Sequence, residues 1–258
     1  MESAELVVVR VVPTRMWHGL VDDEVAGKAH VARRPDGRYF VAVDAWRTEV
    51  FDALLDAVLH DLPRDLSTLV AEGDADELAR WQRRGFEERR RDDEYEIPLD
   101  GADRAVVHVP AGYELLPATA VDVDDLRRLD DEVRQHMPGT SGWVNDPDEF
   151  AASALTSPFV DEATSLVAVE MATGAHAGLV RLAIARRWAR LGLLGVRRDH
   201  ARQGLGRALL TAAFRPLPGR GIEVAVAEAD AGNSAARALL AGFGARRTGG
   251  TVELLRQP

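Results

Sequence analysis

The chain has 258 residues, of which 46% are hydrophobic and 29% charged, a composition typical of a globular protein with one large domain or two smaller ones. It contains no cysteine, which excludes disulfide bonds, thiolate metal sites, iron–sulfur clusters and a cysteine nucleophile. The formal net charge of −10 argues against non-specific binding to nucleic acid, because such binding requires basic side chains that neutralise phosphates.

The sequence also lacks the signals of a membrane or secreted protein. No apolar run approaches the roughly 20 residues that a membrane-spanning helix needs. The chain begins Met-Glu-Ser-Ala-Glu, without the basic segment that opens a signal peptide. We therefore expect a cytoplasmic protein that does not contact membranes.

The first half is predicted to alternate strands and helices. Pro-Asp-Gly at 35–37 is a hairpin turn signal between two strands, and apolar side chains recur at helical spacing over 49–59. We interpret the charged run 87–94 as a solvated surface. The expected strands cover 7–12, 27–33, 38–46, 67–71 and 95–99, and the expected helices cover 49–59 and 76–84.

The second half is predicted to follow the same order with extra helices at its front. The turn-rich stretch Pro98–Gly101 separates the halves, so we expect domains over 1–101 and 102–258. The expected helices cover 121–134, 148–155, 207–214 and 234–241, and the expected strands cover 166–170, 177–185, 191–196, 222–227 and 252–255.

The ends of the two halves match in detail. Leu69–Glu72, a helix and then Gly85 parallel Val226–Glu228, a helix and then Gly244. This favours an internal duplication. The alternative is that strand–helix–strand ends recur in any α/β protein. We expect an α/β (α+β) fold of two tandem domains, each with a mixed, mostly antiparallel central sheet flanked by helices, and with a truncated first copy.

The most informative segment is an apolar strand, a basic loop with glycines, and an amphipathic helix over residues 193–210. Gly204 and Gly206 let the backbone approach a ligand, and the first turn of a helix has unpaired N–H groups that suit a phosphate. Arg202 and Arg207 would add charge-assisted contacts. A dinucleotide-binding fingerprint would need a third glycine where Leu209 stands.

A P-loop is also excluded, because it needs a lysine and the single lysine of the chain is Lys28. The segment instead resembles the acetyl-CoA pyrophosphate loop of the GNAT N-acyltransferase superfamily, Arg/Gln-x-x-Gly-x-Gly/Ala. Gly204 and Gly206 match this pattern, and the leading position departs from it at Ala201, next to Arg202.

A second motif of the superfamily, Asn-x-x-Ala-x-x-Leu-Tyr-x-x-x-Gly-Phe, follows in the right order. Here it reads Asn233, Ala236, Leu239, Leu240, Gly244 and Ala245. The resemblance covers residues 112–258. In plan, a working second copy behind a degenerate first copy is similar to mycothiol synthase-like tandem acetyltransferases. The first copy joins the strand ending at Trp46 to the helix at Glu49 without a glycine loop, so we expect a structural role for it.

The resemblance implies acetyl-CoA as co-substrate and direct transfer of the acetyl group to an amine. It implies that pantetheine pairs with the backbone of Leu194–Val196, and that the N–H of Val196 polarises the thioester carbonyl. The positions that it implies for acetyl-CoA binding are Leu194, Gly195, Val196, Arg202, Gln203, Gly204, Leu205, Gly206, Arg207, Asn233 and Leu240.

Two positions that move protons in the family are changed. Arg190 stands where the family often has a glutamate base, and Leu240 replaces the tyrosine that protonates the thiolate. Glu228 is the first substitute candidate for the base, followed by Glu170 and Asp230. The alternative role of Glu228 is to cap the turn around Asn233. The chain is therefore expected to be an N-acetyltransferase or, alternatively, a non-catalytic acyl-CoA-binding or regulatory module.

The acceptor is expected to be a small, cationic amine. Residues 122–149 are rich in acidic side chains, and in the family this region lies over the acceptor site. We expect Asp130, Asp131, Trp143 and Glu170 to lie near the substrate. The histidines lack His-x-x-x-His spacing, so no metal is expected. We expect a monomer or a homodimer.

Overall fold

The computed structural model describes residues 5–34, 37–140, 142–154 and 161–258. The chain divides into two compact units. The first consists of Met1–Arg90 together with Thr251–Pro258, and the second of Arg91–Gly250. Two long strands, β6 (Glu87–Pro98) and β12 (Arg246–Arg256), contribute residues to both units. The last residues thus belong with the start of the chain, whereas the expected domains divide it once, after residue 101.

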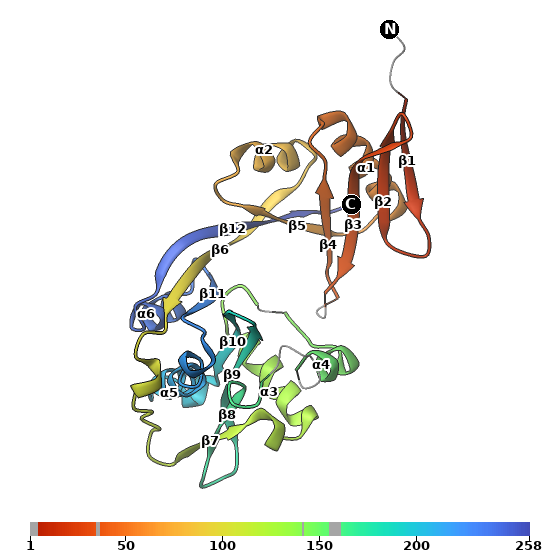
Figure 1. The fold of residues 1–258 in the computed structure, drawn as a ribbon. Helices are drawn as coiled ribbons and strands as arrows, with labels where there is room; N and C mark the ends of the chain where they lie inside the picture. The colour runs from red at the N-terminus through yellow and green to blue at the C-terminus, as the bar shows by residue number, and fades with distance from the viewer. Residues whose placement is uncertain (1–4, 35–36, 141, 155–160) are drawn as a thin grey trace. The chain divides into compact units, whose positions relative to one another are not determined.

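The first unit is a sheet with helices packed on its core (Figure 1). Its strands follow the order β1-β2-β3-β4-β5-β12, and β4 and β5 are parallel because helix α1 connects them. Trp17, Phe51 and Trp81 are almost fully buried in its core. The elements are β1 (Leu6–Val11), β2 (Met16–Val21), β3 (Glu24–Arg33), β4 (Tyr39–Asp44), α1 (Thr48–Asp61), β5 (Leu66–Ala71) and α2 (Ala75–Arg83).

The second unit is a mixed sheet with the order β6-β11-β10-β9-β8-β7. One core packs helix α5 against the sheet through Leu209 and Phe214, and another packs helix α3 through Leu126 and Val133. The elements are β7 (Tyr113–Pro117), α3 (Val123–Gln135), α4 (Pro147–Ala154), β8 (Leu166–Glu170), β9 (His176–Ala185), β10 (Trp188–Val196), α5 (Leu205–Phe214), β11 (Val224–Asp230) and α6 (Ser234–Ala241). Short 3-10 turns cover Ala102–Arg104, Ala118–Ala120, Arg198–His200 and Pro218–Arg220.

The expected fold class is confirmed. The expected helices and strands occur with ends that differ by a few residues, except that the strands expected over 95–99 and 252–255 are only the later parts of β6 and β12, which begin at Glu87 and Arg246. Strands β2 and β7 were not predicted. The solvated surface expected over 87–94 is wrong in part, because β6 begins at Glu87 and buries Asp92 and Asp93. Two predicted features, the turn residues 35–36 and the last residue of the helix over 148–155, lie outside the described residues.

Candidate functional site

An open backbone edge lies in the middle of the second unit's sheet. Strands β10 and β11 pair in parallel only where Ala189–Leu191 face Ala225–Ala227. A bulge between Leu191 and Leu193 interrupts the pairing of β10 with β9, and beyond it Gly192–Val196 have no partner on β11. The two strands therefore part and leave hydrogen-bonding groups of β10 available to a ligand.

The direction of these groups follows from strand geometry. The N–H of Arg197 donates to the carbonyl of Ala177 on β9 at 2.8 Å, next to the pair formed by Val196 and Gly178. Because successive N–H groups of a strand alternate between its two edges, those of Val196 and Leu194 face away from β9, toward the open side. Gly195 between them lets α3 come close, since a Cβ there would lie 2.6 Å from the side chain of Val133.

A helix N-terminus follows the open edge. Gly204 caps α5 with a φ of +94°, a conformation that favours glycine, and its carbonyl accepts the first intrahelical bond from Ala208 at 3.0 Å. The N–H groups of Leu205–Arg207 precede that bond, and none donates to a backbone group among the described residues. The first turn contains no acidic side chain, and the loop from Ala201 to Gly204 is exposed. This arrangement suits an anion.

The polar side chains of the loop differ in what they contact. Tyr113 donates to Oε1 of Gln203 at 3.2 Å, and its hydroxyl lies 2.8 Å from Nδ1 of the buried His200. The guanidinium of Arg207 lies over the ring of Phe243, 5.6 Å from its centroid. Arg202 is exposed at a φ of +65°. Of the two arginines expected to bind the ligand, Arg202 is therefore the one that a ligand can reach without displacing a contact with another described residue.

Asn233 and Leu240 hold helix α6. The Asn233 side chain caps this helix by accepting the N–H of Ala236 at 3.0 Å. Leu240 is 3% exposed and packs in the α5 core. Its neighbour Leu239 reaches the loop instead, because a Cβ built on Gly206 would lie 3.6 Å from Leu239 Cδ2.

The candidate base is engaged in an ion pair that the sequence did not indicate. Nη2 of Arg190 lies 2.8 Å from both carboxylate oxygens of Glu228, and both side chains are about half exposed. Glu228 does not cap the turn before α6. Asp230 does so, since its carboxylate accepts the N–H of Gly232 at 2.8 Å.

Glu228 and Val196 lie at opposite ends of the open edge. Glu228 follows Ala227, which faces Leu191 across the parallel pairing. Val196 is five residues beyond Leu191 on a strand that rises about 3.3 Å per residue, so roughly 15 Å separates their α-carbons. Glu228 therefore cannot directly contact an amine that attacks a thioester held at the N–H of Val196, and a water would have to lie between them.

Three of the four residues expected near the acceptor contact Asn145, a residue that the sequence analysis did not single out. Asp130 accepts from Nδ2 of Asn145 at 2.8 Å, and Asp131 accepts from the N–H of Asn145 at the same distance. Trp143 donates to Oδ1 of Asn145, also at 2.8 Å. The sequence gives no signal for the contacts of Asn145 with Asp130 and Asp131, because they join a residue of the loop to side chains of helix α3.

Asp130 is fully enclosed. Its carboxylate binds Nε of Arg134 at 2.5 Å and Nη2 of Arg181 at 2.7 Å, with no exposure to solvent. Burial lowers the pKa of Arg181, and the charge of Asp130 opposes that shift. Glu170 lies elsewhere, at the β8–β9 turn, where Thr173 donates to its carboxylate at 2.5 Å. In this structure Asp130 is enclosed by Arg134, Arg181 and Asn145, so its expected place near the substrate stays a prediction.

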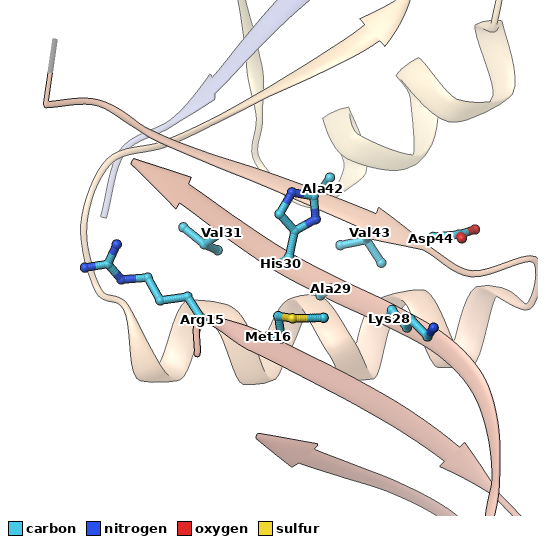
Figure 2. A pocket seen from close by; sticks show the side chains of 9 residues that line it. All are labelled: Arg15, Met16, Lys28, Ala29, His30, Val31, Ala42, Val43 and Asp44. Carbon is cyan, nitrogen blue, oxygen red and sulfur yellow. The ribbon is translucent and has the colours of Figure 1, made fainter. Parts of the chain in front are cut away.

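Two concave regions lie away from these residues. In the first unit, a cavity of 560 Å³ is lined by nine residues of the β2–β4 region, shown in Figure 2. Its charged side chains are Arg15, Lys28 and Asp44, and none of them forms an ion pair among the described residues.

In the second unit, a cavity of 460 Å³ lies beside α6, where Arg237 and Arg247 line it. The hydrogen bond from Arg247 lowers the pKa of Asp93 close by. Neither cavity contains a predicted site residue. Within the described residues no cluster of three metal-ligating side chains occurs, and none of the helices there is long and apolar enough to cross a membrane.

Comparisons with known proteins agree with this geometry. Residues 126–245 match the sequence model of the acetyltransferase (GNAT) family. A GCN5-related N-acetyltransferase from Sphaerobacter thermophilus is 17% identical, with a TM-score of 0.74 over 96% of this chain and 82% of that one. A tandem GNAT protein from the clavulanic acid biosynthesis pathway is 20% identical, with a TM-score of 0.70 over 94% and 82%. No curated protein matches the sequence. The likeness of the structures shows that the whole chain has a tandem GNAT fold.

Proposed function

We propose, since residues 126–245 form a domain of the acetyltransferase (GNAT) family, that this chain transfers an acetyl group from acetyl-CoA directly to the primary amine of a small acceptor. The observation that carries the proposal is the open edge of β10, which runs into an exposed helix N-terminus without an acidic side chain. The edge can pair with an amide-bearing arm, and the helix N-terminus can bind a pyrophosphate.

The residues around this edge suit acetyl-CoA. The N–H groups of Leu205–Arg207 and the guanidinium of Arg202 would bind the pyrophosphate. The outward N–H groups of Leu194 and Val196 would pair with the pantetheine arm. The missing side chain of Gly206 leaves the helix N-terminus open to the pyrophosphate. A Cβ at this position would already be in van der Waals contact with Leu239.

Catalysis would need a hydrogen-bond donor, a base and a suitable leaving group. An N–H on the open edge would stabilise the negative charge that develops on the thioester oxygen. If Glu228 takes the amine proton directly, the thioester would lie near the Gly192 end of the edge, where Leu194 is a closer donor than Val196. If a water relays the proton, the thioester could lie nearer Val196. The thiol of CoA, with a pKa of about 8.5, leaves tolerably without a dedicated acid at Leu240.

The reacting amine of the acceptor would arrive protonated, because an amine is a cation near neutral pH, and the acidic chain favours the approach of this group. Asp130 and Asp131 contribute to that field while they bind Arg134 and Asn145. The first unit would act as a structural partner. A second candidate function, an acyl-CoA-binding module without turnover, is favoured by the Arg190–Glu228 ion pair, which engages the candidate base.

The test is release of thiol from acetyl-CoA against a panel of amines, measured with an aromatic disulfide reagent that releases a coloured thiolate. The protein has no cysteine and adds no background. Amine-dependent release supports the enzyme. Absence of release across the panel, with CoA still raising the melting temperature, supports the binding module.

The Glu228→Gln variant tests the base. We expect kcat to fall about 10-fold or more with acetyl-CoA affinity kept. Glu223→Gln is the matched control, because Glu223 is exposed in the same unit and away from the open edge. An unchanged rate in Glu228→Gln would remove Glu228 from the mechanism.

A further inference from the structure

We infer that the acceptor carries a carboxylate near its reacting amine, as an amino acid does, and that Arg190 binds this carboxylate. The inference rests on the proposed function and specifies its substrate class. It follows from where the Arg190–Glu228 pair lies, how easily it can exchange partners, and what else occupies the same face of the sheet.

The pair lies where the two strands part. Arg190 is the residue before Leu191, the last residue of β10 that faces β11, and Glu228 is the first residue of β11 beyond that pairing. Both reach the same point, since one guanidinium nitrogen contacts both oxygens of the carboxylate. A ligand bound along the open edge of β10 ends beside this pair.

Arg190 is on the sheet face that α3 covers in part. It faces Ala183 across the β9–β10 pairing, and Arg181 lies two residues from Ala183 and so projects from the same face. Arg181 contacts Asp130 of α3, which identifies this face independently. Two guanidinium groups thus lie on the face near the bulge of β10.

The two arginines differ in how firmly their partners hold them. Asp130 is 0% exposed and binds three donors, so an incoming anion cannot replace it. Arg190 and Glu228 are 49% and 43% exposed. Exposed ion pairs of this kind contribute little to stability because water screens them, so a carboxylate of a ligand can replace Glu228 on Arg190 at little cost. Arginine suits this exchange because its planar fork matches a carboxylate.

A second donor on this face lacks an acceptor. Nε of Arg181 is buried and has no hydrogen-bond partner among the described residues. An unmet buried donor destabilises the fold, and a carboxylate oxygen or a water molecule that accepts its hydrogen bond would remove that penalty. Both guanidinium groups therefore favour an anionic group on the acceptor, beside its amine.

The exchange would also prepare the base. When the acceptor's carboxylate takes Arg190, Glu228 loses its cationic partner and can receive the proton of the acceptor's ammonium group. The amine nitrogen then bonds to the thioester carbon and loses its second proton to solvent, the carbon–sulfur bond breaks, and the thiolate takes the first proton back from Glu228. The net reaction forms an N-acetyl amino acid, CoA thiol and one released proton.

The experiment compares amino acids with their carboxamides as acceptors. We expect kcat/KM of the wild-type chain to favour the acids about 10-fold or more, and Arg190→Gln to lose that preference through a higher KM for the acids alone. Arg190→Lys should recover part of it, because lysine keeps the charge without the fork. Arg187→Gln removes an equal charge from an exposed position near the turn into β10 and should keep the preference.

Several results would overturn the inference. One is equal use of acids and carboxamides by the wild-type chain, and another is an equal loss for both in Arg190→Gln. If the wild-type chain acetylates no amine, the proposed function fails, and the inference is tested by calorimetry in the presence of CoA. Tighter binding of amino acids than of carboxamides, lost in Arg190→Gln, would support it; equal binding would overturn it.

Discussion

The N-termini of helices α1 and α5 hold corresponding places in the two units, each after a strand with a parallel partner, but they differ in chemistry. Helix α1 begins after Arg47, and Glu49 lies in its first turn. A backbone hydrogen bond and the guanidinium of Arg47 hold the pKa of Glu49 below its ordinary value of 4.5. Helix α5 begins after Gly204 and has no acid in its first turn.

The difference shows how an anion site is lost or kept in one fold. In the first unit a carboxylate of the chain itself occupies the positive end of the helix, so a pyrophosphate would meet a like charge. In the second unit the same end is free, and a glycine with positive φ lets the chain turn into it. The second unit also has helices α3 and α4 ahead of its strands β8–β10. Asp130 joins α3 to Asn145, two residues before α4, and to Arg181 of β9.

The largest effect is expected from Asp130→Asn, which breaks the interactions that hold these extra helices. The variant leaves the buried charges of Arg134 and Arg181 without their carboxylate, which should cost about 3–5 kcal/mol of unfolding free energy. Chemical denaturation measures it. Asp125→Asn on the exposed side of α3 is the control and should cost about 1 kcal/mol or less. A loss in Asp130→Asn no greater than in this control would contradict the structural role.

The next effect is expected from Gly204→Glu, which makes the start of α5 resemble that of α1. A side chain at a φ of +94° is strained, and its carboxylate would repel a pyrophosphate. Binding of CoA, measured by calorimetry, should weaken about 100-fold, equivalent to about 2.7 kcal/mol. Gly219→Glu adds the same charge at an open position without positive φ and should bind normally. If Gly204→Glu still bound CoA normally, the start of α5 would not be part of the CoA site.

The smallest effect is expected from Glu49→Gln, which removes the carboxylate from α1. The pKa of Glu49 is lowered in the folded chain, so its contribution to stability is present above pH 4.5 and is lost as the pH falls. The variant should therefore melt slightly lower than the wild-type chain at pH 7, and this difference should disappear in acid. Thermal melts from pH 7 to pH 3 measure it. A difference that stays constant with pH would exclude the carboxylate as its cause.

Local patterns predicted most of the fold. The expected strand over 166–170 and helix over 234–241 coincide with β8 and α6. Strand β2 was missed because Gly19 interrupts its apolar pattern. That glycine is required by packing, since a Cβ there would lie 2.9 Å from Val50 of α1. The charged start of β6 was misread because the partners of its charges, among them Glu253 and Arg247, lie far along the chain.

The sequence by itself determined the order of elements and the glycine loop at Gly204, because helical periodicity, strand alternation and turn residues act between near neighbours. Only the tertiary structure decided that Arg190 pairs with Glu228, that Asn145 joins Asp130 to Trp143, and that the last strand returns to the first unit. These contacts join distant segments, and their geometry depends on how the strands part and where the helices pack. A charged residue in a sequence indicates that it needs a partner, and the fold determines which one it has.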